Sequence, residues 1–513
     1  MSDGSATSGR APVAFLAALS LATLLYCAGT AWTALGGVPH VQDELSYLLQ
    51  ARIFAHGALW APPSADGVLV ASEYQQLTPR WFGVFPPGWP MVLALGARLG
   101  LPWLVNPLLA AGLPWLCWAA FSPVLRRTEA WFACAVAAFS PGILALGSSM
   151  MSHTLVLFDL LACVAAVRAG WFGVAGVAIG VTILARPLDG FVAGAPLIVW
   201  AATRARGSEH ARLLVGPALG MALLLALNRA YTGSPFTFAV NRYFDAGSDW
   251  GMHWRPDCNR LGFGADRGCQ ASYKAEGYTP AMGLEFFGAN AHFFDVLLLG
   301  FPLGGVVGLL GFGALVRRKA AEWPIVAAAV GPMAASSCYW YHGICYGARF
   351  WHPMYLLALP SLGVALGRWP RVGAVVLALG VGWTAPEVWR ELADDYWGVS
   401  SHLGAELDAA GVTDGVVLVN PTGLPVRHWN LLKWERGECL PWLRPGAGLG
   451  ENDPIVPGPI LFLRYPSGLA TTQSGGSPPR VPTLAQVEAM HPDVPIWQAN
   501  VSLDAPTEVR RLR

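Results

Sequence analysis

The sequence predicts an all-α polytopic membrane protein of about 11 transmembrane helices, followed by a small α/β extracytoplasmic C-terminal module. Three observations predict this class. Hydrophobic residues make up 54% of the 513 residues, charged residues only 13%, and the mean hydropathy is +0.44. Basic clusters separate the apolar segments at regular intervals, and residues 387–513 are polar. Soluble domains carry about 25% charged residues, so this chain has too little polar surface to cover a soluble globule.

The first apolar segment covers about 12–36 and follows Arg10, which is the arrangement of a signal peptide. The segment is longer than the usual h-region of about 7–15 residues, and it lacks a small-residue cleavage site. We therefore expect a retained first span, with the N-terminus in the cytoplasm.

A span needs roughly 20 apolar residues, and basic clusters collect on the cytoplasmic side. Together the two rules place ten further spans at about 102–125, 130–147, 153–168, 171–186, 188–203, 211–230, 292–315, 323–341, 350–366 and 372–386. Tight basic clusters such as Arg126–Arg127 then all fall on one side. The expected division is a transmembrane domain over 1–386, with long outer loops at about 37–101 and 231–291, and a periplasmic module over 387–513.

The module is predicted from two strand-like runs and one helix-like run. These are "GVVLVN" (415–420), "PILFLRY" (459–465) and "TLAQVEAMH" (483–491). The Gly/Pro/Ser-rich stretch at 444–480 leaves a loosely structured tail as the alternative.

The first outer loop opens with an acidic pair, Asp43 and Glu44. Asp43 is placed like an N-cap, and an apolar stripe follows at helical spacing: Leu45, Leu48, Leu49 and Ile53. Such a helix is typical of the headgroup plane, with its stripe in lipid. At the end of the loop, the prolines of "RWFGVFPPGWP" (80–90) are expected to stop any helix.

Two interpretations of the acidic pair remain open from the residues alone. In one, the carboxylates only cap a surface helix. In the other, Asp43 is a general base at the boundary between water and lipid, where partial burial raises a carboxyl pKa toward a useful value.

Other polar residues have structural interpretations. Asp159, in the middle of a span, is expected to hydrogen-bond between helices, because charge in the membrane is costly. Arg186 and Asp189 are three residues apart and are expected to pair. Cys258 and Cys269 share one polar loop, and their pairing in an oxidising compartment is left open.

Several stretches together resemble the GT-C superfamily of polytopic glycosyltransferases, which includes the protein O-mannosyltransferases and the bacterial lipid A aminoarabinose transferases. They are the first span followed by Asp-Glu and "YLLQARIFAHG", then "FPPGWPMVLALG", "ILARPLDGF" (183–191), "NRAYTGSPFTFAVNRYF" (228–244) and "YGARFWHPMYLLALP" (346–360). The resemblance covers about residues 12–386 and points to a bacterial branch.

The resemblance implies a sugar donor on a polyprenyl phosphate, transfer on the periplasmic side, and the aspartate of the first loop as base. That role maps onto Asp43, with Glu44 as a neighbour that tunes or orients it. Many members carry a second acidic residue where this chain has His153, a departure that weakens any metal-dependent mechanism and makes His153 a candidate hydrogen-bonding residue for donor or acceptor.

A leaving phosphate needs cationic contacts, and arginine grips phosphate oxygens in pairs. Arg349, in "GARF", is the favoured phosphate contact, and Arg52 and Arg242 are further candidates. For each of the three, an ordinary interfacial anchor is the alternative.

The predicted function is therefore transfer of a sugar from a polyprenyl-phosphate donor to a lipid, glycan or protein acceptor at a bacterial inner membrane. No cofactor and no metal are expected. The sequence contains no P-loop, no His-Glu-x-x-His and no Cys-x-x-Cys motif, and its net charge of +1 gives no reason to expect nucleic acid. A transporter or flippase of a lipid-linked saccharide, and a non-catalytic membrane scaffold, are the competing functions.

Overall fold

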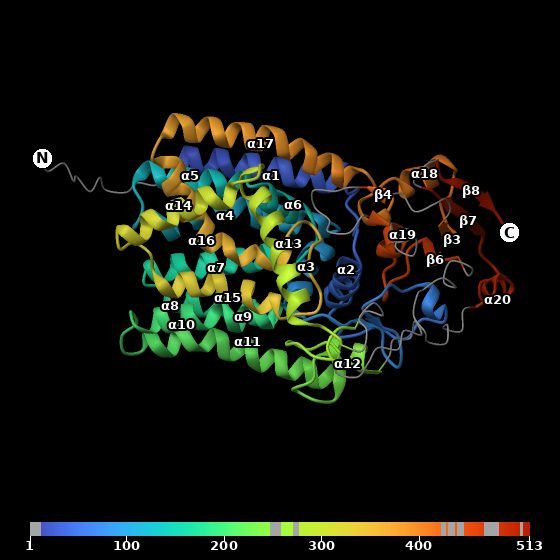
Figure 1. Ribbon diagram of the computed structural model, residues 1–513. Coiled ribbons are helices and arrows are strands. Elements are labelled where there is room, and N and C mark those ends of the chain that lie inside the picture. Colours follow the sequence, from blue (N-terminus) through green and yellow to red (C-terminus); the bar gives the residue numbers. More distant parts are fainter. Residues whose placement is uncertain are drawn as a thin grey trace, which may run out of the picture.

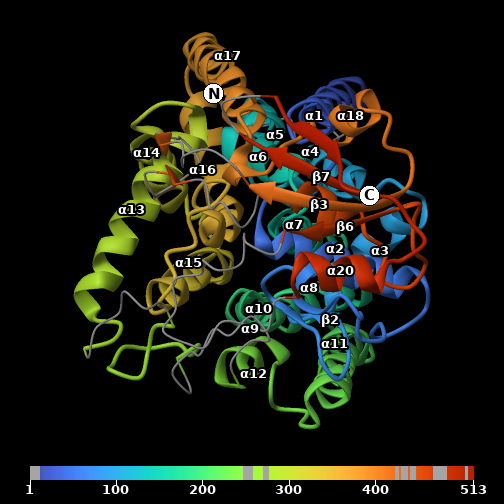
Figure 2. The ribbon, with the colours of Figure 1, turned by 90° about the vertical axis from the view of Figure 1, so that its right-hand side faces the viewer.

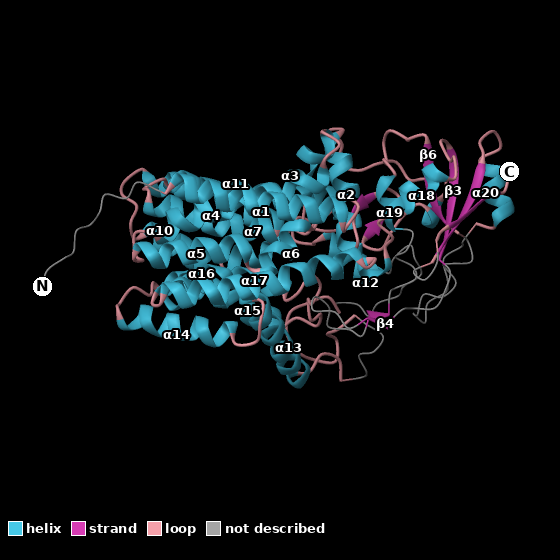
Figure 3. Ribbon diagram, turned by 90° about the horizontal axis from the view of Figure 1, so that it is seen from above, coloured by secondary structure: helices cyan, strands magenta, loops and turns pink. Residues whose placement is uncertain are grey.

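The computed structural model consists of a long bundle of helices and a small sheet at one end of it (Figures 1 and 3). It describes residues 12–246, 258–269, 276–421, 427–428, 437–438, 446–465, 482–502 and 506–513. The helix α2 (Gln42–Ala55) lies between the bundle and the sheet in both views.

Most helices of the bundle follow one another through short turns, and longer connections precede α3, α13 and α16. They are α1 (Val13–Thr33), α3 (Gly88–Arg98), α4 (Val105–Phe121), α5 (Arg127–Phe139), α6 (Pro141–Ser148), α7 (His153–Arg168), α8 (Phe172–Ala185), α9 (Pro187–Val192), α10 (Gly194–Ala202), α11 (Glu209–Thr232), α13 (Pro280–Leu299), α14 (Gly304–Arg317), α15 (Trp323–Ser337), α16 (Tyr355–Gly367) and α17 (Pro370–Ala393). The helix α12 (Ala239–Ala246) and the 3-10 turns η1 (Gly67–Leu69), η2 (Pro102–Leu104), η3 (Arg349–Met354) and η4 (Tyr396–Gly398) lie in the connections.

Five of the described helices are long and apolar enough to cross a membrane: Val13–Thr33, Pro102–Phe121, Glu209–Thr232, Pro280–Leu299 and Pro370–Gly398. The bent pair α5 and α6, with 42° between its halves, adds a sixth if it is one span. The chain is thus a mostly helical, multi-pass membrane protein, and the predicted count of about 11 spans is not confirmed.

The expected continuous span at 292–315 is wrong. The helix α13 already begins at Pro280 and ends at Leu299, and α14 starts at Gly304 in a new direction (Figure 1). Gly300 takes a left-handed conformation with φ of 88°, which ends α13. Pro302 follows, and it has no N–H to continue the helix.

The proline-rich end of the first outer loop was expected to stop any helix, and this prediction is wrong as well. The helix α3 runs from Gly88 to Arg98 with Pro87 as its N-cap and Pro90 in its first turn. The first backbone N–H groups of a helix have no intrahelical partner, so proline is tolerated there. The loop also holds a short antiparallel pair, β1 (Gln75–Gln76) with β2 (Phe82–Gly83).

The C-terminal module contains a four-stranded sheet in the order β6-β3-β7-β8. Strands β6 (Ile460–Arg464), β3 (Gly415–Pro421) and β7 (Ile496–Val501) are parallel, and β8 (Glu508–Arg511) is antiparallel to β7. Helices α18 (Leu403–Ala409), α19 (Gly446–Glu451) and α20 (Leu484–Met490) accompany the sheet, which faces the viewer in Figure 2; β4 (Arg427–His428) and β5 (Gly437–Glu438) form a separate pair. The predicted strands at 415–420 and 459–465 and the helix at 483–491 are confirmed, whereas residues 444–445 and 466–480 of the Gly/Pro/Ser-rich stretch lie outside the described residues.

The end of the bundle away from the sheet carries the turns between α4 and α5, α7 and α8, α10 and α11, α14 and α15, and α16 and α17. We call it the basic end, because it holds the arginine clusters. Arg168 and Arg204 both pair with Glu322 there, and Arg318 pairs with Glu129 at 2.7 Å. These ion pairs join turns far apart in the chain. The opposite end, next to α2 and the sheet, is called the site end below.

Candidate active site

The helix α2 places the acidic pair at its first turn, but not as the sequence predicts. The N-cap is Val41, and Asp43 occupies the second helical position, so its predicted role as N-cap is wrong. Glu44, at the third position, accepts from the backbone N–H of the N-cap Val41 at 3.3 Å, as the third residue of a capping box does. Two carboxylates in the first turn also suit the positive end of the helix dipole.

The apolar stripe of α2 packs on protein and not on lipid. Leu45, Leu48, Leu49 and Ile53 are each at most 6% exposed. Leu49 and Ile53 belong to an apolar cluster with Leu418 and Leu463 of the sheet, and Leu45 to a second one with Val417. The predicted contact of this stripe with lipid is therefore wrong. The stripe packs against the C-terminal module instead, and helical spacing alone cannot distinguish the two kinds of contact.

Glu44 is buried, with 1% of its surface exposed, and is held by four uncharged donors. Its carboxylate accepts from the backbone N–H groups of His40 at 2.8 Å, Val41 at 3.3 Å and Met150 at 2.8 Å, and from the Tyr346 hydroxyl at 3.1 Å. Burial raises the pKa of Glu44 to about 7, although these donors favour the charged form. Glu44 thus ties α2 to the turn before α7 and to the segment before η3, and so orients its neighbour Asp43.

Asp43 forms an ion pair with the buried Arg349. Asp43 Oδ2 lies 2.9 Å from Arg349 Nη1, the Asp43 side chain is 17% exposed, and that of Arg349 is 6% exposed. Arg349 begins η3, which leads directly into α16. The structure therefore joins two predicted site residues that are 306 positions apart.

Arg349 has an N–H donor that no described residue accepts from. Its Nη1 donates to Asp43 and lies 3.9 Å from Met151 Sδ, while Nε has no hydrogen-bond partner among the described residues. A guanidinium carries five N–H donors, so Arg349 can stay paired with Asp43 and still bind an anion.

A second arginine, Arg186, shares an aromatic neighbour with Arg349. Their guanidinium carbons lie 5.4 Å and 5.3 Å from the centroid of the Phe350 ring. Arg186 lies between α8 and α9, donates to Asp189 as predicted, and reaches Ser152 Oγ at 3.4 Å. The sequence interpretation of Arg186 as a purely structural pair missed its place beside Arg349.

Two buried histidines complete this cluster. His153 and His352 are each 2% exposed, and the His153 ring stacks on Phe350 with 6.1 Å between centroids. Both ring nitrogens of His153, and Nε2 of His352, lack a hydrogen-bond partner within the described part of the chain. A buried polar group without a partner costs about 1–3 kcal/mol, so these atoms favour a ligand that hydrogen-bonds to them.

Two other predicted phosphate contacts have partners elsewhere. Arg52 Nη1 donates to the Asn452 carbonyl of the C-terminal module at 2.6 Å. Arg242 is exposed, and its Nη1 donates to the Thr232 carbonyl at 2.6 Å. The structure does not give either arginine a contact with the pair of Asp43 and Arg349, so their phosphate role stays a prediction.

Sequence analysis missed Glu73, a half-buried carboxylate in the first outer loop. Burial raises the pKa of Glu73 to about 7; Arg464 of strand β6 opposes the rise, as does a hydrogen bond with the Gln42 side chain, whereas the charge of Asp43 adds to it. Glu73 therefore lies within electrostatic reach of Asp43. No sequence signal marks it, because the loop around it has neither helical nor strand periodicity.

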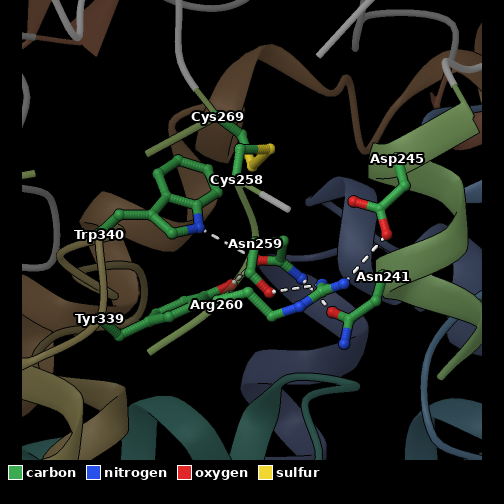
Figure 4. The surroundings of a disulfide bond; sticks show 8 residues. All are labelled: Asn241, Asp245, Cys258, Asn259, Arg260, Cys269, Tyr339 and Trp340. Atoms are coloured by element: carbon green, nitrogen blue, oxygen red, sulfur yellow. Dashed lines mark hydrogen bonds and ion pairs between the residues drawn. A yellow bond between two sulfur atoms is a disulfide. The ribbon is translucent and has the colours of Figure 1, made fainter. Parts of the chain in front are cut away.

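The segment that carries Arg349 is held by a disulfide-closed loop (Figure 4). Cys258 and Cys269 are bonded, which settles the pairing left open above. Asn259 is 7% exposed; its Oδ1 accepts from the Tyr339 hydroxyl at 2.6 Å and from Trp340 Nε1 at 3.0 Å, and its Nδ2 donates to Asn241 at 2.8 Å. The loop thus fixes the start of the stretch from Tyr339 to Arg349.

A metal centre finds no support in this geometry. Within the described residues no group of three or more His, Cys, Asp or Glu side chains is arranged to hold a metal ion. The cluster combines two guanidinium groups with carboxylates, which is a donor set suited to an anion.

Among known proteins, no family model and no curated protein matches the chain. Several solved structures are similar to this chain over most of its length. ArnT from Cupriavidus metallidurans in the apo state is 16% identical over 80% of this chain and 82% of that chain, with a TM-score of 0.47. ArnT from the same organism bound to undecaprenyl phosphate is 16% identical over 78% and 74%, with a TM-score of 0.44.

The archaeal oligosaccharyltransferase AglB from Archaeoglobus fulgidus, in complex with an inhibitory peptide and a dolichol-phosphate, is 10% identical over 79% of this chain, with a TM-score of 0.44. This chain spans 62% of that protein. The TM-scores of these three matches are all below 0.5, so we base no argument on them.

Proposed function

We propose that the chain is a glycosyltransferase that moves a sugar from a polyprenyl-phosphate donor to a hydroxyl of a lipid, glycan or protein acceptor, with Asp43 as general base. One observation carries the proposal. A partly exposed carboxylate is paired with a buried guanidinium that has donors to spare, at the end of an apolar helical bundle. This is the arrangement needed to activate a hydroxyl beside a leaving phosphate.

In the proposed step the acceptor oxygen attacks the anomeric carbon of the donor sugar. The bond between that carbon and the phosphate oxygen breaks, and the polyprenyl phosphate leaves with the electron pair. Asp43 takes the proton of the acceptor hydroxyl and later releases it to water. Arg349 binds the phosphate oxygens through donors other than its Nη1, and thereby holds base and leaving group at a fixed separation.

Arg186 and His153 are the proposed second contacts of the phosphate. Arg186 lies on the same Phe350 ring as Arg349, and His153 has unpaired ring nitrogens there. Two cations around one leaving phosphate stabilise the charge that develops as the glycosidic bond breaks. Glu44 acts only by orienting Asp43, since its oxygens are taken by backbone and tyrosine donors.

We also propose that the site end faces the periplasm at a bacterial inner membrane, and that the shorter apolar helices bring the spans to about 11. The basic end then lies in the cytoplasm, as the positive-inside rule requires. In intact cells, a membrane-impermeant maleimide should label Gly404→Cys in the C-terminal module and not Arg206→Cys at the basic end. The reverse pattern would disprove the orientation.

The decisive test of function compares membranes that contain the wild type, Asp43→Asn or Asp408→Asn, using radiolabelled polyprenyl-phosphate sugars. General-base catalysis contributes about 10²- to 10⁴-fold, so Asp43→Asn should lower transfer by at least about 100-fold. Asp408 is an exposed carboxylate on α18, and its substitution should have no effect. Transfer by Asp43→Asn at the wild-type rate would exclude the proposed base and favour a transporter or scaffold.

A further inference from the structure

The turn between α6 and α7, residues 149–152, contacts both halves of the proposed reaction centre. On the side of the base, the Met150 backbone N–H donates to Oε1 of Glu44, the carboxylate that orients the base, at 2.8 Å. On the side of the phosphate, Met151 Sδ lies 3.9 Å from Arg349 Nη1. The position of this turn therefore affects the carboxylate and the guanidinium group at the same time.

The same turn leads to the other proposed phosphate contacts. Ser152 Oγ lies 3.4 Å from Arg186 Nη1, and His153, the first residue of α7, follows directly in the chain. A shift of the turn therefore moves contacts of the base and contacts of the phosphate together. Reaction rates depend steeply on the placement of the reacting groups, and a displacement of about 1 Å can lower a rate by about 100-fold.

Asn106, the second residue of α4, holds this turn by two hydrogen bonds. Its Nδ2 donates to the Ser149 carbonyl at 2.7 Å and to the Met151 carbonyl at 2.7 Å, and the side chain is 1% exposed. Because both neighbours are carbonyl oxygens, the amide nitrogen and not the amide oxygen must face the turn. Asn106 therefore fixes the carbonyls on both sides of Met150, whose N–H binds Glu44.

Trp89 of α3 adds a third hydrogen bond to the turn. Its Nε1 donates to the Met150 carbonyl at 2.8 Å, and the side chain is fully buried. Side chains from α3 and α4 thus bind the carbonyls of three successive residues, Ser149, Met150 and Met151. The chain is not helical between α6 and α7, so buried carbonyls there need donors from elsewhere in the protein.

We propose that Asn106 and Trp89 are positioning residues of the active site, which act through the turn at 149–152. They hold Glu44, and with it Asp43, in a fixed arrangement with the arginines that contact the same turn. This inference rests on the proposed glycosyl transfer. Both residues act through the backbone of the turn, so they set the geometry of the site and take no part in the bond changes.

The first experiment measures kcat and the KM for the acceptor in the wild type, Asn106→Leu, Trp89→Phe and Asn228→Leu. We expect kcat to fall about 10- to 100-fold in Asn106→Leu and less in Trp89→Phe, with little change in KM, because the reacting groups are misplaced. Asn228 of α11 is the control, because it is also buried and its Nδ2 donates to the Pro235 carbonyl at 3.2 Å. Its substitution should lower the Tm and leave kcat unchanged. Wild-type kcat in Asn106→Leu would contradict the proposal.

The double variant Asn106→Leu/Trp89→Phe tests whether the two residues act through one turn. Substitutions that act through a shared segment have effects that do not add in free energy. We therefore expect the double variant to lose little more kcat than Asn106→Leu alone. A loss equal to the product of the two single losses would show that the residues act independently, and would overturn the inference. Trp89→Phe, which removes a single hydrogen bond, gives the same comparison with the control if Asn106→Leu does not fold.

A second measurement does not depend on transfer. Met150 and Met151 are 4% and 0% exposed, and peroxide oxidises a thioether faster once it becomes accessible. Mass spectrometry of peptides should show faster oxidation of both methionines in Asn106→Leu than in the wild type or Asn228→Leu. An unchanged oxidation rate, or faster oxidation with wild-type kcat, would leave Asn106 without a role in the site. Absence of transfer in the wild type would instead count against the proposed function alone.

Discussion

Two glutamates occupy equivalent places at opposite ends of the bundle. Glu44 in α2 and Glu129 in α5 are each the third residue of a helix, each accepts from the backbone N–H of its N-cap residue, and each is almost fully buried, at 1% and 2% exposure. At the basic end, Glu129 is paired with Arg318 at 2.7 Å. At the site end, Glu44 takes only uncharged donors, and the nearby Arg349 pairs with the more exposed Asp43.

The difference teaches how the same residue types make either a structural contact or a site. At the basic end, arginine and glutamate side chains form ion pairs that connect the turns. At the site end, the Nε of the buried Arg349 has no hydrogen-bond partner among the described residues, and its carboxylate partner Asp43 is partly exposed. The two ends carry the same kinds of charged residues. They differ in that Arg349 at the site end has an N–H donor without a partner among the described residues.

The largest expected effect comes from removing one arginine at each end. Arg349→Gln should lower sugar transfer by about 100- to 1000-fold, because the leaving phosphate loses its main cationic contact. Arg318→Gln should leave transfer near the wild-type rate and lower the Tm, because Glu129 loses its partner. Arg349→Lys should recover part of the activity, since it keeps the charge but loses the planar fork. Equal losses of transfer in Arg349→Gln and Arg318→Gln would contradict the proposal that only the site end takes part in sugar transfer.

A smaller effect is expected when the disulfide-closed loop at the site end loses Asn259. Asn259→Ala removes three hydrogen bonds that hold Tyr339, Trp340 and Asn241. Each is worth about 1 kcal/mol, and we expect transfer to fall about tenfold as the segment before Arg349 loosens. Asn420→Ala, which loses a hydrogen bond to Asn500 within the sheet, is the matched control. Loss of transfer only in the control would show that the disulfide-closed loop has no part in the site.

The smallest effect concerns stability against pH. The pKa of Glu44 in the folded protein, about 7, is above its unfolded value of 4.5. The stability linked to this raised pKa is therefore present at low pH and is lost as the pH rises through about 7, by at most about 1.4 kcal/mol per pH unit. Glu44→Gln lacks the ionisable group, so its Tm should rise relative to that of the wild type between pH 5 and pH 8.5. A Tm difference that does not change with pH would contradict the assignment.

The sequence was sufficient for the features that depend on local pattern. Long apolar segments set the membrane class, since a bilayer requires about 20 apolar residues per span. Short apolar, strand-like runs predicted strands β3 and β6, and Thr483 with Gln486 forms the capping box that begins α20. The chemistry of arginine singled out Arg349, and the position after the first span singled out Asp43.

The local sequence pattern did not predict features that depend on the surrounding structure. The spacing of the apolar residues in α2 is the same whether lipid or a sheet covers them. Only the tertiary structure shows that Leu418 and Leu463 pack on this face of the helix. Gly300 and Pro302 lie inside an apolar run that is long enough for one continuous span. In the structure they separate α13 from α14.

The sequence by itself determined that this chain is a helical membrane protein with an acidic pair after its first span and a polar C-terminal module. Only the tertiary structure decided that Asp43 is partly exposed and paired with Arg349 whereas Glu44 is buried, because the two carboxylates differ in what surrounds them and not in their chemistry. It also brought Arg349 and Arg186, from distant parts of the chain, to the same Phe350 ring. Burial and pairing are properties of contacts between segments, and no local stretch of sequence contains them.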